Sequence, residues 1–69
     1  MKIYSVNYGN DNEGCYKASG LFTYIDNAKT LLEALVKEQN DVGCFYEPAG
    51  EDYYRDGYDY IKIFECELQ

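Results

Sequence analysis

Hydrophobic and polar residues alternate along the first part of the chain. Residues 2–8 alternate with the period of two that is typical of a β-strand, and one face gathers two tyrosines and a valine. Residues 9–14, Gly-Asn-Asp-Asn-Glu-Gly, are nearly all turn formers. Residues 15–22 then predict a second strand. This part of the chain is therefore expected to fold as an antiparallel β-hairpin.

The period changes to a helical one over residues 24–39. Apolar residues recur there at spacings of three and four and form a single stripe. The stripe consists of Ile25, Ala28, Leu31, Leu32, Leu35 and Val36. Thr23 is placed to cap the N-terminus, and Asp26 follows it at the capping-box position, where it also suits the helix dipole. The sequence predicts one amphipathic helix.

The segment after the helix is less regular. Residues 42–47 are compatible with a short strand, whereas residues 47–59 form an acidic stretch that we expect to be irregular. Residues 58–68 alternate again and predict a closing strand. The order β-β-α-(β)-β predicts an α+β fold, an antiparallel three- to four-stranded sheet with one helix packed on one face. We expect a single domain spanning residues 1–69.

One helix can cover only one face of such a sheet, so the other face must be solvated or covered by a partner. In the closing strand, five residues share one face: Tyr60, Lys62, Phe64, Cys66 and Leu68. Tyrosine and isoleucine exposed on so short a chain would reduce its solubility. We therefore expect a homo-oligomer or a stable complex through this face, with a homodimer as the commonest closed form.

Three segments together resemble a known group of proteins. These are the opening Lys-Ile-Tyr-Ser-Val, the Gly-Leu-Phe-Thr of residues 20–23 that leads into the helix, and the final strand over residues 61–68. They are similar to small acidic β-β-α-β proteins that are common in phages and mobile elements. Such phage proteins include inhibitors of bacterial defence systems, anti-CRISPR proteins among them. The resemblance covers most of the chain and implies a cellular context, but it transfers no functional residues.

The charge balance narrows the choice of partner. Thirteen acidic residues face six basic ones in 69 residues, which gives a net charge of −7. An acidic surface repels phosphate backbones and anionic membranes, so we expect neither direct nucleic-acid binding nor membrane binding. A protein partner with a basic surface is favoured instead. Strand-like sequence begins directly after Met1 and no long apolar run follows, so we expect a cytoplasmic protein in the host bacterial cell.

Residues that commonly carry catalysis or bind metals are sparse. The chain has no histidine, which removes the usual general base and the usual metal ligand. A calcium-loop pattern beginning at Asp52 fails, because Tyr54 and Ile63 occupy two of the ligand positions. The three cysteines are widely spaced and are expected to be reduced and structural: Cys15, Cys44 and Cys66. We therefore expect no enzyme, no cofactor and no metal.

The candidate site is the acidic stretch, which is also rich in tyrosine. Its carboxylates would meet Arg and Lys on a partner in the manner of a DNA mimic, and its tyrosine rings would act as anchors. The predicted partner-binding residues are Glu51, Asp52, Tyr53, Tyr54, Asp56, Tyr58 and Asp59. The alternative is a solvated loop whose tyrosines pack along the edge of the sheet.

Three functions are compatible with these features. The first is a non-enzymatic inhibitor that blocks the basic nucleic-acid-binding surface of a CRISPR or other defence effector. The second is a structural or assembly role as a homo-oligomer or accessory subunit. The third is a nucleotide sponge, in which tyrosines stack on bases, although six basic residues make a poor phosphate cradle in so acidic a chain.

Overall fold

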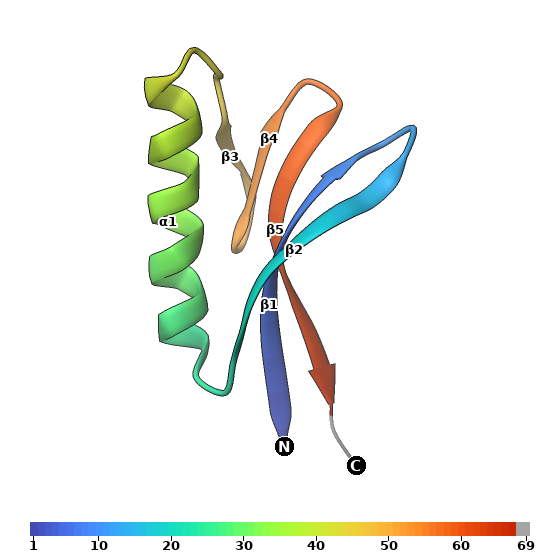
Figure 1. Cartoon of the computed structure of the whole chain (residues 1–69), viewed down its shortest axis with the longest axis vertical. Coiled ribbons are helices and arrows are strands. Elements are labelled where there is room, and N and C mark those ends of the chain that lie inside the picture. Colours follow the sequence, from blue (N-terminus) through green and yellow to red (C-terminus); the bar gives the residue numbers. More distant parts are fainter. Residues whose placement is uncertain (68–69) are drawn as a thin grey trace.

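The computed structural model describes residues 1–67, except for the side chains of residues 15–17. A five-stranded antiparallel sheet packs against one helix, in the order β2-β1-β5-β4-β3 (Figure 1). The elements are β1 (Lys2–Asn10), β2 (Gly14–Phe22), α1 (Ile25–Asp41), β3 (Glu47–Gly50), β4 (Tyr53–Asp56) and β5 (Asp59–Glu67). The predicted α+β fold is confirmed, with five strands in place of three or four.

The sheet is centred on the long antiparallel pair β1 and β5. Val6 lies opposite Ile63 in this pair and Tyr8 lies opposite Ile61, so the apolar positions of the two strands fall on the same face. The predicted hairpin pairs β1 with β2, and its turn is shorter than expected because β1 continues through Asn10. The first residues of β1 therefore lie beside the last residues of β5, as Figure 1 shows.

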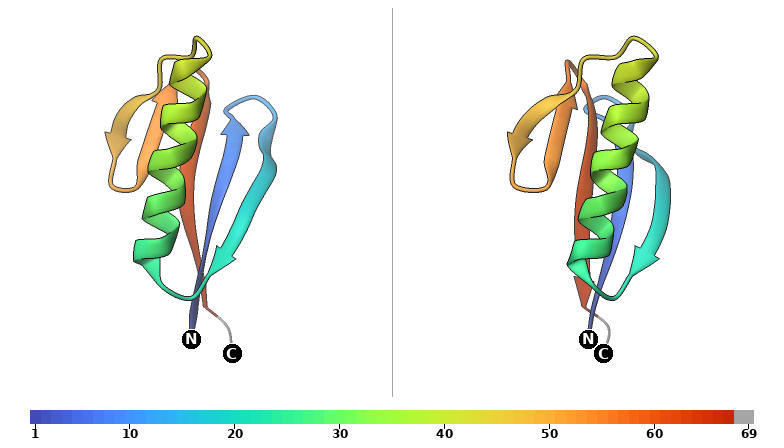
Figure 2. Two further views of the ribbon diagram at one scale, coloured as in Figure 1. Left: turned by 60° about the vertical axis from the view of Figure 1, so that its left-hand side comes forward. Right: turned by 90° about the vertical axis from the view of Figure 1, so that its left-hand side faces the viewer.

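Helix α1 lies across one face of this sheet only (Figure 2). Its predicted apolar stripe is confirmed, since Ala28, Leu32 and Val36 are buried against the sheet. The predicted Thr23 cap is wrong: Tyr24 is the N-cap residue and makes no side-chain capping bond. The helix starts when Asn27 N donates to the Tyr24 carbonyl, one residue later than a Thr23 cap requires.

Strands from opposite ends of the chain build the core beneath the helix. Val6 of β1 and Ile61 of β5 are completely buried, and Leu32 of α1 is 2% exposed against them. Asn40 ties the end of the helix to the next segment, because its side-chain amide accepts from Tyr46 N at 2.7 Å and donates to Tyr46 O at 3.1 Å. This pair of hydrogen bonds holds the Tyr46 side chain in the core.

The region after the helix differs from expectation. No strand forms over residues 42–46, and the acidic stretch is ordered as the short hairpin β3–β4 followed by the start of β5. Pro48 occurs in the edge strand β3, where a missing backbone donor is tolerated. Asp52 adopts a left-handed conformation with φ of 53°, which asparagine and aspartate accept better than most residues, and this allows the tight turn. Turn-forming residues therefore shape a hairpin here instead of an irregular loop.

Candidate interaction surfaces

The seven predicted partner-binding residues do not form one row. Glu51 and Asp52 lie at the β3–β4 turn, whereas Asp56, Tyr58 and Asp59 lie around the β4–β5 turn at the other end of β4. The two tyrosines of β4 point to opposite faces of the sheet. Tyr54 packs against the core under the helix, and Tyr53 lies on the face without a helix. The structure thus divides the predicted site between two ends and two faces.

Three of its carboxylates are engaged within the molecule. Asp56 Oδ2 accepts a hydrogen bond from Phe45 N at 3.1 Å, and Asp59 Oδ1 accepts one from Asn10 Nδ2 at 2.8 Å. Asp52 Oδ1 lies 3.8 Å from Lys29 Nζ of α1. Glu51 is exposed. The expectation that these acidic groups lie in an irregular segment is therefore wrong, because they lie in or between strands β3, β4 and β5.

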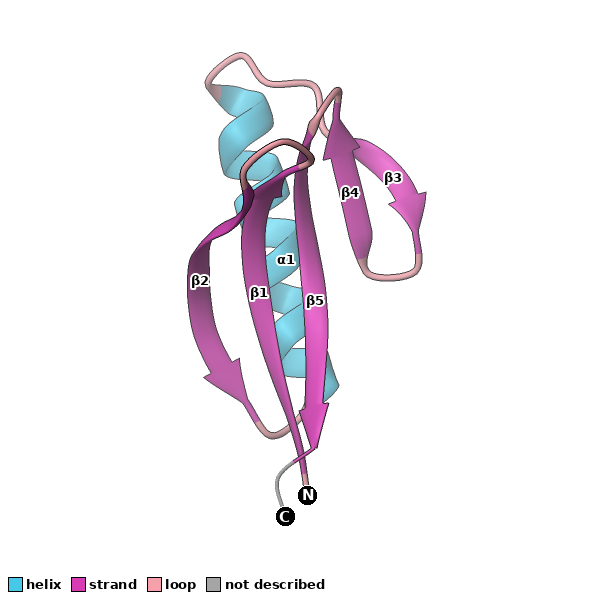
Figure 3. Cartoon of the chain, turned by 90° about the vertical axis from the view of Figure 1, so that its right-hand side faces the viewer, coloured by secondary structure: helices cyan, strands magenta, loops and turns pink. Residues whose placement is uncertain are grey.

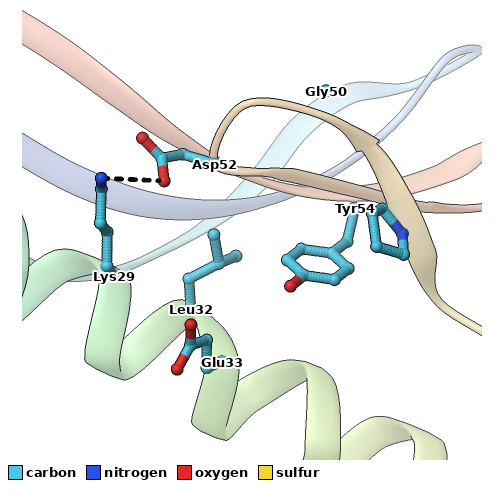
Figure 4. Close-up of a pocket in the computed structure, with 7 residues that line it drawn as sticks. Lys29, Leu32, Glu33, Gly50, Asp52 and Tyr54 are labelled. Carbon is cyan, nitrogen blue, oxygen red and sulfur yellow. Dashed lines mark ion pairs between the residues drawn. The ribbon is translucent and has the colours of Figure 1, made fainter.

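Two hollows flank Asp52 on the helix side of the sheet. The smaller, of about 90 Å³, separates α1 from the β3–β4 hairpin, and Figure 4 shows Leu32 and Tyr54 facing one another across it. It is lined by Lys29, Leu32, Glu33, Pro48, Gly50, Asp52 and Tyr54. The larger, of about 240 Å³, is lined by Tyr4, Ile25, Glu51, Asp52, Ile63 and Glu65. Each hollow combines apolar side chains with carboxylates.

The electrostatics of these hollows are strongly one-sided. Four carboxylates line them, against Lys29 as the one lining cation: Glu33, Glu51, Asp52 and Glu65. Lys2 lies outside the lining, with Nζ 2.8 Å from Glu65 Oε1. The hydrogen bond and charge of Glu65 raise the pKa of Lys2 above its ordinary value. We call this surface the acidic gap, defined by those four carboxylates.

The opposite face of the sheet has no helix over it and is called the open face (Figure 3). Aromatic rings and cations alternate across β4 and β5 on this face. The Arg55 guanidinium lies 5.7 Å from the centre of the Tyr53 ring and 5.9 Å from that of Tyr60. Lys62 Nζ lies 5.3 Å from the Tyr53 centre and 5.4 Å from that of Phe64. Cation–π contacts thus hold both cations against the sheet.

Arg55 is anchored more firmly than Lys62. Its guanidinium donates to the Tyr53 hydroxyl and forms an ion pair with Asp11 of the β1–β2 turn. The pKa of Arg55 is raised above its ordinary value, chiefly by the hydrogen bond to Tyr53. Burial opposes this rise, and the hydrogen bond and charge of Asp11 add smaller contributions to it. Among the described side chains, no carboxylate forms an ion pair with Lys62. Lys62 is therefore a half-buried cation without a counter-ion.

Apolar side chains extend the open face toward the chain ends. Leu21 of β2 is 76% exposed, and the strand register places it, Ile3 and Phe64 on this face. Cys66 is a free, exposed thiol opposite Ile3, and Cys44 is a free, half-buried thiol near the helix end. The side chain of Cys15 and the predicted position of Leu68 lie outside the described residues. The open face thus combines apolar, aromatic and cationic groups.

The sequence predicted only part of the cluster of rings and cations on the open face. Strand alternation correctly placed Tyr60, Lys62 and Phe64 on one face. It missed the contribution of Arg55, because the pairing of β4 with β5 has no signal in a stretch dominated by turn formers. A weak signal was available: Tyr53 and Arg55 are two residues apart, which is the spacing of one strand face.

Comparison of the chain with protein-family models, with curated proteins and with solved structures gave no match. Within residues 1–67, no helix is long and apolar enough to cross a membrane. The described Cys, Asp and Glu side chains include no group of three arranged to hold a metal ion. The functional interpretation therefore rests on the geometry of two surfaces, the acidic gap and the open face.

Proposed function

We propose that this protein is a non-enzymatic binding domain for a protein with a basic surface, and that it docks through the acidic gap. One observation carries the proposal: two hollows share Asp52, and four carboxylates line them against a single cation. The surface expected from sequence is thereby shifted, because Glu51 and Asp52 stay in it while Asp56 and Asp59 do not.

The hollows suit the side chains of lysine and arginine. Both side chains have an apolar stem and a charged head, and both bury the stem along apolar surface while the head stays polar. Leu32 and Tyr54 offer an apolar floor in the smaller hollow, with Asp52 at its rim. A guanidinium there would replace Lys29 as the partner of Asp52, and charge-assisted hydrogen bonds to arginine are stronger than a long lysine contact.

In its finer form, the proposal is an inhibitor that occupies the nucleic-acid-binding surface of a bacterial defence effector, with carboxylates in place of phosphates. The net charge of −7 supports it through long-range attraction to such a surface. The resemblance to small phage proteins supports the cellular context. A nucleotide sponge is less well supported, because Asp11 and Tyr53 already occupy Arg55 and leave Lys62 as the cation open to a phosphate on that face.

A deca-arginine peptide tests the docking site by calorimetric titration. Glu51→Gln with Asp52→Asn should weaken binding by about tenfold or more, equivalent to about 1.4 kcal/mol. Asparagine suits the left-handed backbone at position 52, so the turn should persist. Glu13→Gln with Asp41→Asn, two exposed carboxylates that line neither hollow, is the matched control, since both pairs change the net charge from −7 to −5. Equal weakening by the two pairs would show that net charge alone governs binding.

Removing the competing lysine gives a second test with the opposite sign. Lys29→Gln should strengthen binding of the same peptide, because it frees Asp52 for an incoming guanidinium. Lys37→Gln on the exposed face of α1 gives the same net charge of −8 and should change affinity less. If the two variants gain equally, the smaller hollow is not where arginine binds.

The inhibitor form needs a target. Proteins captured by wild type, but not by the Glu51→Gln/Asp52→Asn variant, would be purified from a bacterium that carries defence systems. Binding of each to labelled nucleic acid would then be measured with increasing amounts of this protein. Displacement of the nucleic acid by wild type alone is the expected result. Unchanged nucleic-acid binding by every captured protein would refute the inhibitor form.

A further inference from the structure

We infer that the open face is covered in solution by a second copy of this chain. The inference is independent of the acidic gap, because the open face and the gap lie on opposite sides of the sheet. It rests on three properties of the open face: its extent, its charge and the composition of its side chains.

The open face is large enough for a stable dimer if it is covered along its whole length. The molecule measures 39 × 25 × 19 Å, and the open face runs along the longest and shortest of these dimensions (Figure 3). The product of those two is an upper bound on the flat area of this face, and it is close to the roughly 800 Å² that each partner buries in a standard interface. A second copy would therefore have to cover most of the face. A smaller ligand would leave much of the exposed apolar surface in water, including Leu21.

The charge of the open face favours a second copy over an oppositely charged protein. Strand register and ion pairing assign four charged residues to it, two cations and two carboxylates: Arg55, Lys62, Asp11 and Glu47. Their charges cancel, so the described side chains that the strand register and ion pairing assign to this face add nothing to the net charge of −7. Two copies of so acidic a protein repel one another least when they meet through a neutral face.

The side chains on this face are those that protein interfaces favour. Aromatic residues and arginine are enriched in interface cores, and Tyr53, Tyr60 and Arg55 lie together here. Lys62 forms no ion pair with any described carboxylate of its own chain, and the exposed Glu47 at the edge of the same face is a carboxylate that a second copy would bring. In a two-fold dimer every such contact occurs twice.

The chain length adds a reason for such a partner. A domain of this size buries only about 60% of the surface of its unfolded chain, and small domains commonly gain stability from oligomerisation. A dimer through the open face would leave both copies of α1 and both acidic gaps facing outward, because these lie on the other side of each sheet.

Sedimentation of wild type and two matched pairs of variants tests the inference. Lys62→Glu places a third negative charge on the open face, whereas Lys37→Glu makes the same change on the exposed side of α1. Leu21→Gln and Val42→Gln replace side chains that are 76% and 75% exposed, on and off the open face respectively. Wild type and both controls should dimerise alike, and both open-face variants should raise the dimer dissociation constant about tenfold or more.

A wild type that stays monomeric up to about 1 mM, the weakest range of specific association, would overturn the inference. An equal change in the dimer dissociation constant in all four variants would also overturn the inference. A second measurement needs no variant: the exposed Cys66 thiol should be alkylated more slowly as the protein concentration rises. Alkylation of Cys66 at one rate across the dimerisation range would also overturn the assignment of this face.

Discussion

The two faces of strand β5 differ in character although they alternate along the same nine residues. Toward the helix, Ile61 is completely buried and Ile63 is 9% exposed. On the open face, Tyr60 and Lys62 are half-buried and Phe64 is 37% exposed, among rings and cations. Beneath α1, the covered face of β5 is therefore apolar and buried at Ile61 and Ile63. The open face instead combines apolar area with rings and cations that can form further contacts.

This difference separates stability from binding within one sheet. The free energy of folding of a small domain comes mainly from apolar burial, and that burial lies between α1 and the covered face. The open face contributes less to the folded monomer because its side chains are still partly hydrated. Substitutions on the covered face should therefore change the free energy of unfolding, whereas substitutions on the open face should mainly change binding. The following predictions test that division.

The largest expected effect comes from truncating a leucine on the covered side. Leu32→Ala should lower the free energy of unfolding by about 2–5 kcal/mol, because Leu32 is almost fully buried against the sheet. Leu21→Ala on the open face should change the stability of the dilute monomer by less than about 0.5 kcal/mol. Urea unfolding followed by circular dichroism measures both. Comparable losses in the two variants would contradict the division between the faces.

A smaller effect is expected where a ring covers the backbone of the open face. The Tyr60 side chain lies over Gly9, so a Cβ at position 9 would collide with its ring. Gly9→Ala should therefore cost about 1–3 kcal/mol, or displace the ring from its contact with Arg55. In a Tyr60→Ala background the same change should cost much less, since the two effects are coupled. An equal cost in both backgrounds would mean that another contact limits position 9.

The smallest of these effects concerns the acidic residues that hold the hairpin. Asp56→Lys should destabilise the protein by about 1–2 kcal/mol, because Phe45 N loses the carboxylate that accepts its hydrogen bond. Glu51→Lys, at the exposed β3–β4 turn, should change stability by less than about 0.5 kcal/mol. Thermal unfolding of the two variants distinguishes structural carboxylates from free ones. If neither substitution changes the stability, the acidic stretch of residues 47–59 is a loosely held loop after all.

How far the sequence predicted this structure depends on the strength of each periodic signal. The helix stripe around Leu32 and the alternation of β5 were predicted correctly, because ten or more residues repeat one pattern. The β3–β4 hairpin was missed because each strand has only four residues and its turn depends on the conformation of Asp52. The Thr23 cap was wrong by one residue, because the helix begins at Ile25 with Tyr24 as its N-cap and local sequence specifies helix ends only loosely.

The candidate site was predicted only in part for the same reason. Composition drew attention to a tyrosine-rich acidic segment, but composition cannot say which carboxylates bind inside the molecule. Asp59 is held by Asn10, a residue 49 positions away, and Arg55 meets Asp11 across 44 positions. Such contacts depend on strand order in the sheet, which a single sequence does not reveal.

Two sides of the molecule are thus assigned two different occupants, and side-chain NMR can observe both in one protein. Dilution should shift the signals of Leu21 and Phe64 on the open face and leave those of Leu32 and Ile25 unchanged. Addition of the deca-arginine peptide to the dilute protein should do the reverse, with the largest shifts around Asp52. If both treatments shift the same set of side chains, or if neither shifts the open face, the assignment of separate occupants to the two sides is contradicted.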